Sequence, residues 1–177
     1  IILSKGPENL YLDSLLKSFL DFYKYVYDFR NKNGARYEND EISLVEAFKK
    51  HTHWDSGLNP PYAVKANDIL YNLLLKDNYA GITATANGFY GPQGRILRLQ
   101  PHNPQLNELY SSFEWNGLKL TNYEMETSAL YGLAGLLGHN ACTICAIIAN
   151  RYIKEYSKNY HQTIDKLIGT LLDRLTT

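Results

Sequence analysis

The chain has 177 residues, 45% hydrophobic and 20% charged, which is enough to bury the core of one soluble domain. Lysine and arginine (18) balance aspartate and glutamate (18), and this balance argues against the basic surface of a nucleic-acid-binding protein. No apolar run approaches the ~20 residues that span a bilayer. We therefore expect a cytoplasmic protein that binds neither nucleic acid nor a membrane.

The N-terminal half is predicted to begin with a strand and a long helix. Ile1–Leu3 is typical of a strand, and apolar residues recur at helical spacing over 12–26. Because a strand at residue 1 would have no neighbours, we expect 1–177 to be part of a single α/β domain that lacks its N-terminal segment. Helices are predicted next over 41–50 and 64–76. The buried face of the second is predicted to be Ile69, Leu70, Leu73 and Leu74.

Strands and helices alternate through the rest of the chain. Strands are predicted over 80–85, 96–99 and 143–150. Helices are predicted over 104–113, 126–137 and 162–175. Asn103 is the expected cap of the first of these helices, and Gly138 the expected stop of the second. This alternation is typical of an α/β domain.

Cys142 and Cys145 form a C-x-x-C, which could be a redox pair or half of a zinc site. They lie in a continuous apolar run typical of a buried strand, on which positions three apart point to opposite faces. We therefore expect two buried, reduced and inert thiols. His51 and His53 have no further metal ligands near them in sequence, so no metal is expected.

The loop at 87–95 is the first candidate site, because ligands of α/β folds bind where strands end. Its glycines match neither a dinucleotide-binding nor a phosphate-binding fingerprint. Phe89 and Tyr90 offer a flat platform, the amide of Gln93 can donate and accept, and the guanidinium of Arg95 only donates. This set suits a pyrimidine-like ring. An exposed turn with a solvated arginine is the alternative.

Two further polar clusters are candidate sites. Thr121 and Glu124 have the spacing of a capping box, which is the structural interpretation of the first cluster. Glu124 and Glu126 can serve one ligand only if the backbone there is extended and the helix begins after Glu124. A carboxylate that accepts two hydrogen bonds from a vicinal diol would bind ribose. In the second cluster, Arg151 follows a predicted strand. A charged residue in this position is either exposed to solvent or placed next to a ligand.

The chain resembles the uridine phosphorylases of the nucleoside phosphorylase superfamily in three stretches with the family's order and spacing. These are Phe89-Tyr90-Gly91-Pro92-Gln93-Gly94-Arg95, Asn122-Tyr123-Glu124-Met125-Glu126 and Ile148-Ala149-Asn150-Arg151. The resemblance is good from Pro60 onward and loose over 1–59. It implies a mixed central sheet flanked by helices. It also implies a pentosyltransferase that cleaves uridine, or deoxyuridine, with phosphate into uracil and (deoxy)ribose 1-phosphate.

The resemblance also implies the residues of the site. Those that would bind substrate are Phe89, Gln93, Arg95, Glu124, Met125, Glu126, Ile148, Ala149 and Arg151. Gln93, Arg95 and Glu126 would be catalytic: the first two would stabilise charge on the departing uracil, and Glu126 would hold the ribose with Met125. The only co-substrate implied is phosphate, with no cofactor and no metal. A homodimer or a higher homo-oligomer is also implied.

Two features of the sequence bear on which relative it resembles. Purine-specific relatives carry an aspartate after the strand that corresponds to 143–150, whereas Asn150 and Arg151 stand here and favour a pyrimidine. The family's phosphate-binding segments of its N-terminal half, Gly-Asp-Pro-Gly-Arg and Gly-Thr-Cys-Gly-like, do not occur, so no phosphate ligand is assigned. The alternatives are a purine nucleoside phosphorylase, a nucleosidase and a non-catalytic nucleoside-binding relative.

Overall fold

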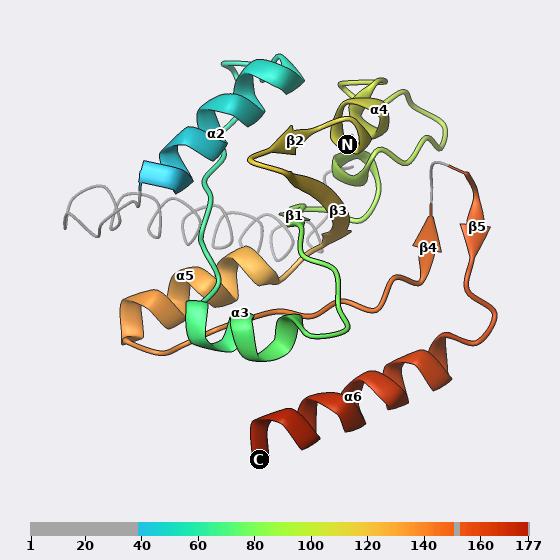
Figure 1. Cartoon of the computed structure of the whole chain (residues 1–177). Coiled ribbons are helices and arrows are strands. Elements are labelled where there is room, and N and C mark those ends of the chain that lie inside the picture. Colours follow the sequence, from blue (N-terminus) through green and yellow to red (C-terminus); the bar gives the residue numbers. More distant parts are fainter. Residues whose placement is uncertain (1–38, 151–152, 177) are drawn as a thin grey trace, which may run out of the picture.

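The computed structural model describes residues 39–150 and 153–176, and Figure 1 shows how they are arranged. The helices are α2 (Asn39–Thr52), α3 (Asp68–Leu75), the 3-10 helix η1 (Gly91–Gln93), α4 (Leu106–Ser111), α5 (Thr127–Leu137) and α6 (Tyr160–Thr176). The strands are β1 (Ile82–Thr85), β2 (Glu114–Trp115), β3 (Leu118–Glu124), β4 (Ala149–Asn150) and β5 (Glu155–Tyr156). The elements predicted over 1–3 and 12–26, and the candidate Arg151, lie outside the described residues.

A mixed sheet lies at the centre of the described chain. β3 is its middle strand, with β1 parallel on one side and β2 antiparallel on the other. β2 and β3 are joined by Asn116 and Gly117, whose φ angles are 48° and 78°, and positive φ at both turn positions matches the twist of a hairpin. In the view of Figure 1, α3 and α5 lie below this sheet, and α2 and α4 lie above it. The predicted α/β class, with a mixed sheet flanked by helices, is confirmed.

Several predicted elements are present with shifted ends. β1, α2, α5 and α6 correspond to the elements predicted over 80–85, 41–50, 126–137 and 162–175. α5 stops where expected, because Gly138 takes a left-handed conformation with φ 72°. The helix predicted over 104–113 is shorter: it begins at Leu106, and the side chain of Asn103 accepts a hydrogen bond from the N–H of Gln105 (2.9 Å) before that helix starts.

One predicted strand is absent and another is much shorter than predicted. Residues 96–99 form no strand. Of the segment predicted over 143–150, only Ala149–Asn150 forms a strand, which pairs antiparallel with β5. The residues before it belong to no strand, since an apolar run favours burial but does not supply a neighbouring strand to pair with.

The helix predicted over 64–76 is limited to α3. Its start is fixed by Asn67, whose side-chain oxygen accepts a hydrogen bond from the N–H of Leu70 (3.1 Å). Of the face expected to be buried, only Leu74 is buried, at 6% exposed. Ile69 is 73% exposed, so this part of the predicted face is wrong.

Aromatic side chains from α2, α4 and β3, together with Phe113 between α4 and β2, form the core next to the sheet. Phe113 is 2% exposed, and its ring packs edge-on against Phe48 with 5.3 Å between centroids. Phe48 also meets Tyr110 at 5.3 Å, and Tyr110 stacks on Tyr123 of β3 at 5.4 Å. Burial raises the pKa of Tyr110 to about 12. This cluster therefore fixes α4, and the loop that leads into it, against β3.

α6 contacts α3, and in the view of Figure 1 its C-terminal end lies below that helix. Arg174 of α6 donates hydrogen bonds to the carbonyls of Leu74 (3.2 Å) and Lys76, at the C-terminal end of α3. Its other terminal nitrogen lies 3.0 Å from a carboxylate oxygen of Asp77. None of the described helices combines the length and the apolar character needed to cross a bilayer.

Replacing Arg174 with alanine should lower the free energy of unfolding by about 1–3 kcal/mol. The guanidinium shares the two carbonyls at the end of α3 with the side-chain amide of Asn78, and it adds the ion pair with Asp77. Its side chain is only 16% exposed. Urea unfolding of the full-length protein would measure this loss. The control is Lys166→Ala, on an exposed position of the same helix. Equal effects from both substitutions would show that Arg174 does not anchor α6.

Candidate active site

The candidate site lies where the parallel strands β1 and β3 end side by side. Thr85 is paired with Glu124 in register, and the N–H of Ala86 donates to the carbonyl of Glu124 over 2.8 Å. The loop at 87–95 follows β1 directly, and Met125 and Glu126 follow β3. The carboxyl ends of parallel strands are where α/β folds bind ligands. Two of the three predicted stretches therefore begin at the same edge of the sheet.

The loop at 87–95, here named the base loop, holds the side chain of Arg95 in place. The guanidinium carbon of Arg95 lies 3.4 Å from the centroid of the Phe89 ring. One guanidinium nitrogen donates to the carbonyl of Phe89 and to the side-chain oxygen of Gln93 (3.2 Å). Gln93 is 3% exposed, and Phe89 meets Tyr90 edge-on at 5.2 Å. Arg95 is therefore half-buried and held against an aromatic face and an amide of its own loop.

Asn107 of α4 fastens the base loop to the sheet. Its amide nitrogen donates to the carbonyl of Gly94 (3.1 Å), and its oxygen accepts from the hydroxyl of Tyr123 on β3 (3.1 Å). Gly94 has φ 68°, and a β-carbon there would lie 2.5 Å from the side-chain oxygen of Asn107. Only glycine fits this position. Asn107 is not among the residues predicted for the site; its one signal in the sequence is an asparagine within a helix, where the residue is unfavourable without a specific contact.

Glu124 and Glu126 have different environments. One carboxylate oxygen of Glu124 accepts from the hydroxyl of Thr85, and the other accepts from the N–H groups of Glu126 (2.6 Å) and Thr127. The carboxylate of Glu126 is exposed and accepts from the N–H of Met125 (3.1 Å). α5 begins at Thr127, after Glu124, which is the condition for both carboxylates to serve one site. The capping-box interpretation is wrong because the first residue of that pair, Thr121, lies within β3.

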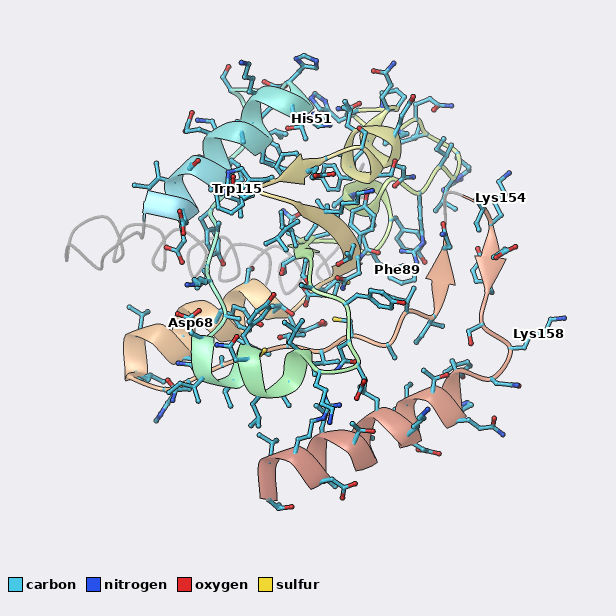
Figure 2. The ribbon with its side chains drawn as sticks, viewed as in Figure 1. His51, Asp68, Phe89, Trp115, Lys154 and Lys158 are labelled. Atoms are coloured by element: carbon cyan, nitrogen blue, oxygen red, sulfur yellow. The ribbon has the colours of Figure 1, made fainter. Side chains whose placement is uncertain are left out.

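The third stretch, 148–151, begins three residues after Cys145. Cys145 lies beside Asn122 of β3; burial raises the pKa of its thiol, and the negative charges of Glu124 and Glu126 add to this. Ile148 is 43% exposed and Ala149 half-buried, at the start of β4. In the view of Figure 2, Phe89 lies between β3 and β4. The chain just before this stretch therefore lies beside β3, at Asn122.

The two cysteines are both free and half-buried, so the expectation of full burial is wrong. Burial also raises the pKa of the Cys142 thiol, which keeps it protonated at neutral pH. Within 39–150 and 153–176, no three metal-binding side chains come together. His51 instead forms hydrogen bonds with the carbonyl of Leu109 (2.9 Å) and the hydroxyl of Ser112 (3.1 Å), and therefore joins α2 to α4.

Side chains near the carboxyl ends of β1 and β3 are exposed among the described residues. These include the apolar side chains of Phe89 (51%), Tyr90 (54%) and Met125 (37%), and Ile148 of the third stretch is 43% exposed. A pocket of about 170 Å³ lies elsewhere, near the C-terminal end of α5, and none of the predicted site residues lines it. Because its lining carries none of the candidate chemistry, we place the site at the strand ends.

Comparison with known proteins identifies the family. The model of the Phosphorylase superfamily matches residues 23–175. Uridine phosphorylase of Thermococcus kodakarensis is 38% identical over 86 residues, which are 45% of this chain and 28% of that protein. Uridine phosphorylase of Haemophilus influenzae is 27% identical over 101 residues, 53% of this chain and 38% of that protein.

A solved structure shows the same fold. The crystal structure of a Trypanosoma brucei nucleoside phosphorylase, described as showing uridine phosphorylase activity, matches with a TM-score of 0.71 and 24% identity. The match covers 84% of this chain and 53% of that one, so this chain spans about half the length of that structure and less of the two relatives above. Since the family model covers most of the sequence and the fold agrees with it, the chain belongs to the phosphorylase superfamily.

Proposed function

We propose that this protein is a pyrimidine nucleoside phosphorylase, which converts uridine and phosphate reversibly into uracil and ribose 1-phosphate. The observation that carries the proposal is the pairing of buried Gln93 with Arg95 in the loop that follows β1, while Glu126 follows β3, whose end is paired with the end of β1. The names of the two uridine phosphorylase relatives support it. Asn150, where purine-specific relatives carry an aspartate, favours a pyrimidine base. Deoxyuridine is the second substrate that the proposal includes.

The reaction requires hydrogen-bond donors to the uracil and no covalent nucleophile. The bond between the ribose carbon and the uracil nitrogen breaks, its electron pair leaves with uracil, and a phosphate oxygen bonds to the ribose carbon. Arg95 and the amide of Gln93 would donate to the uracil oxygens, where this negative charge develops. Their contacts with each other and with Phe89 hold them in place beforehand, so little reorganisation is needed in the transition state. We assign no residue of this chain to the phosphate.

The remaining site residues would form the pocket around the nucleoside. Met125 and Glu126 would hold the ribose, while Ile148 and Ala149 would line the base side and Arg151 would support Arg95. The exposed aromatic and aliphatic side chains at this edge support a further expectation, because clustered apolar surface marks a ligand or subunit contact. We expect a homodimer or a higher homo-oligomer, which light scattering on the full-length protein would test.

Replacing Glu126 with alanine should lower kcat/KM for uridine about tenfold or more, the effect of losing one charge-assisted hydrogen bond. The loss should be smaller for 2′-deoxyuridine, which has one hydroxyl fewer for the carboxylate to bind. The measurement is steady-state phosphorolysis of both nucleosides. Glu114→Ala, at an exposed position on β2, is the control and should change neither value. Equal losses on both nucleosides would contradict the assignment of Glu126 to the ribose.

Product formation from uridine with and without phosphate tests the function itself. The full-length protein should release uracil together with ribose 1-phosphate, and only when phosphate is present. Release of free ribose without phosphate would instead indicate a nucleosidase. Turnover of inosine without turnover of uridine would indicate a purine enzyme, and binding of uridine without turnover a non-catalytic relative. Each of these three results would overturn the proposal.

A further inference from the structure

The carboxylate of Glu124, at the end of β3, is hydrogen-bonded to two other elements of the site. From β1 it receives the hydroxyl of Thr85, and from the start of α5 it receives the N–H groups of Glu126 and Thr127. The oxygen of Thr85 in turn accepts from the N–H of Ser128 (2.9 Å). Thr85 is 39 residues away from Glu124 in the chain, so this is a tertiary contact and not a local turn. Both carboxylate oxygens are therefore engaged by the protein.

The backbone of the same residue reaches the base loop. The carbonyl of Glu124 accepts from the N–H of Ala86, one residue before the base loop begins. The side chain, through the N–H of Glu126, holds the residue assigned to the ribose. Glu124 thus contacts the chain on the base side and the chain on the ribose side at the same time. A shift of this residue would move both the start of the base loop and the start of α5.

We propose that Glu124 is a positioning residue, which holds the base loop and the ribose carboxylate in register, and that it is not itself a ligand of the ribose. The inference rests on the proposed function and gives it a further residue. Thr85 shares the role, because its hydroxyl donates to the carboxylate while its oxygen caps α5 through Ser128. A carboxylate is required, since it offers two acceptor oxygens for the three donors.

The conservative variant Glu124→Gln tests the requirement for two acceptors. An amide has one acceptor oxygen, so its nitrogen must face either the N–H groups of α5 or the hydroxyl of Thr85. We expect kcat to fall about tenfold or more, because small misplacements of reacting groups cost up to ~10²-fold. KM should change little. The loss should be equal for uridine and 2′-deoxyuridine, in contrast to the unequal losses expected for Glu126→Ala.

Threonine variants on β1 provide matched controls. Thr85→Val removes the hydroxyl and should lower kcat as Glu124→Gln does, whereas Thr85→Ser keeps the hydroxyl and should restore it. Thr83→Val removes a comparable bond between β1 and β3, from the Thr83 hydroxyl to Asn122 (3.0 Å), that does not reach α5. This control should keep kcat within about threefold, a change worth less than 1 kcal/mol. A double variant at 85 and 124 should lose no more than the worse single variant.

The outcomes separate this role from the proposed function. No turnover by the unmodified protein would overturn the proposed function and the role of Glu124 with it. If the unmodified protein turns over uridine, three results would overturn the role of Glu124 alone. The first is a selective loss on uridine in Glu124→Gln, as expected for a direct ligand. The others are unchanged kcat in Glu124→Gln and Thr85→Val, or an equal loss in Thr83→Val.

Discussion

Substitution of Arg95 by alanine should lower kcat/KM for uridine by ~10²-fold or more, the scale for losing one preorganised donor at a site of developing charge. The guanidinium is fixed by the Phe89 ring, the Phe89 carbonyl and the amide of Gln93. Its loss would leave the buried amide of Gln93 without this neighbour and the departing uracil without its cationic donor. Steady-state phosphorolysis of uridine by the full-length protein would measure the effect.

Arg98→Ala is the matched control for this prediction. Arg98 is an exposed arginine three positions further along the same segment, and it has no role in the proposed chemistry. Its removal should change kcat/KM by less than about threefold, which corresponds to well under 1 kcal/mol. A loss below threefold in Arg95→Ala itself would mean that the base loop does not bind the base.

Phe113→Ala should have the largest effect on folding, lowering the free energy of unfolding by about 3–5 kcal/mol. The ring is 2% exposed and packs against Phe48 and His51, at 5.3 and 5.4 Å between centroids. Alanine would leave a cavity next to side chains that are held by α2 and α4, and such cavities collapse only in part. Equilibrium unfolding in urea gives the free energy directly.

Phe89→Ala is the control for Phe113→Ala, since it removes an equal ring from a side chain that is 51% exposed. The free energy of unfolding should fall by about 1 kcal/mol or less, through loss of the contact with Arg95. Phe89→Ala should lower activity towards uridine, because Phe89 belongs to the base loop. Folded Phe113→Ala protein should keep more of that activity. A comparable loss of stability in both would contradict the placement of the core between α2 and the sheet.

Local signals in the sequence predicted some elements of the fold well. Gly138 ends α5 through a left-handed conformation that glycine adopts without strain, so the stop could be predicted from one residue. β3 was missed although its sequence alternates apolar and polar residues over 118–121 and follows Asn116-Gly117, a strong hairpin signal. Conversely, the apolar segment over 143–148 gave a strand signal, but strand formation there depends on a neighbour that the sequence does not reveal.

The sequence predicted which residues belong to the candidate site. It did not predict the contacts between them, because these depend on tertiary structure. Gln93, Arg95 and Glu126 were singled out for their chemistry and by the resemblance, and their assignment stays a prediction. The role of Glu124 depends on Thr85, 39 residues earlier, which only strand pairing brings within reach. Asn107 likewise depends on the packing of α4 beside β3. Neither contact can be predicted from the spacing of residues in the sequence.

A crystal structure of the full-length protein with bound uridine would test the central claim most directly. We expect one nucleoside at the carboxyl ends of β1 and β3, with its uracil edge at Gln93 and Arg95 and its ribose hydroxyls at Glu126. Uridine bound away from this edge, or a guanidinium of Arg95 and a carboxylate of Glu126 that cannot contact the same molecule, would contradict the account.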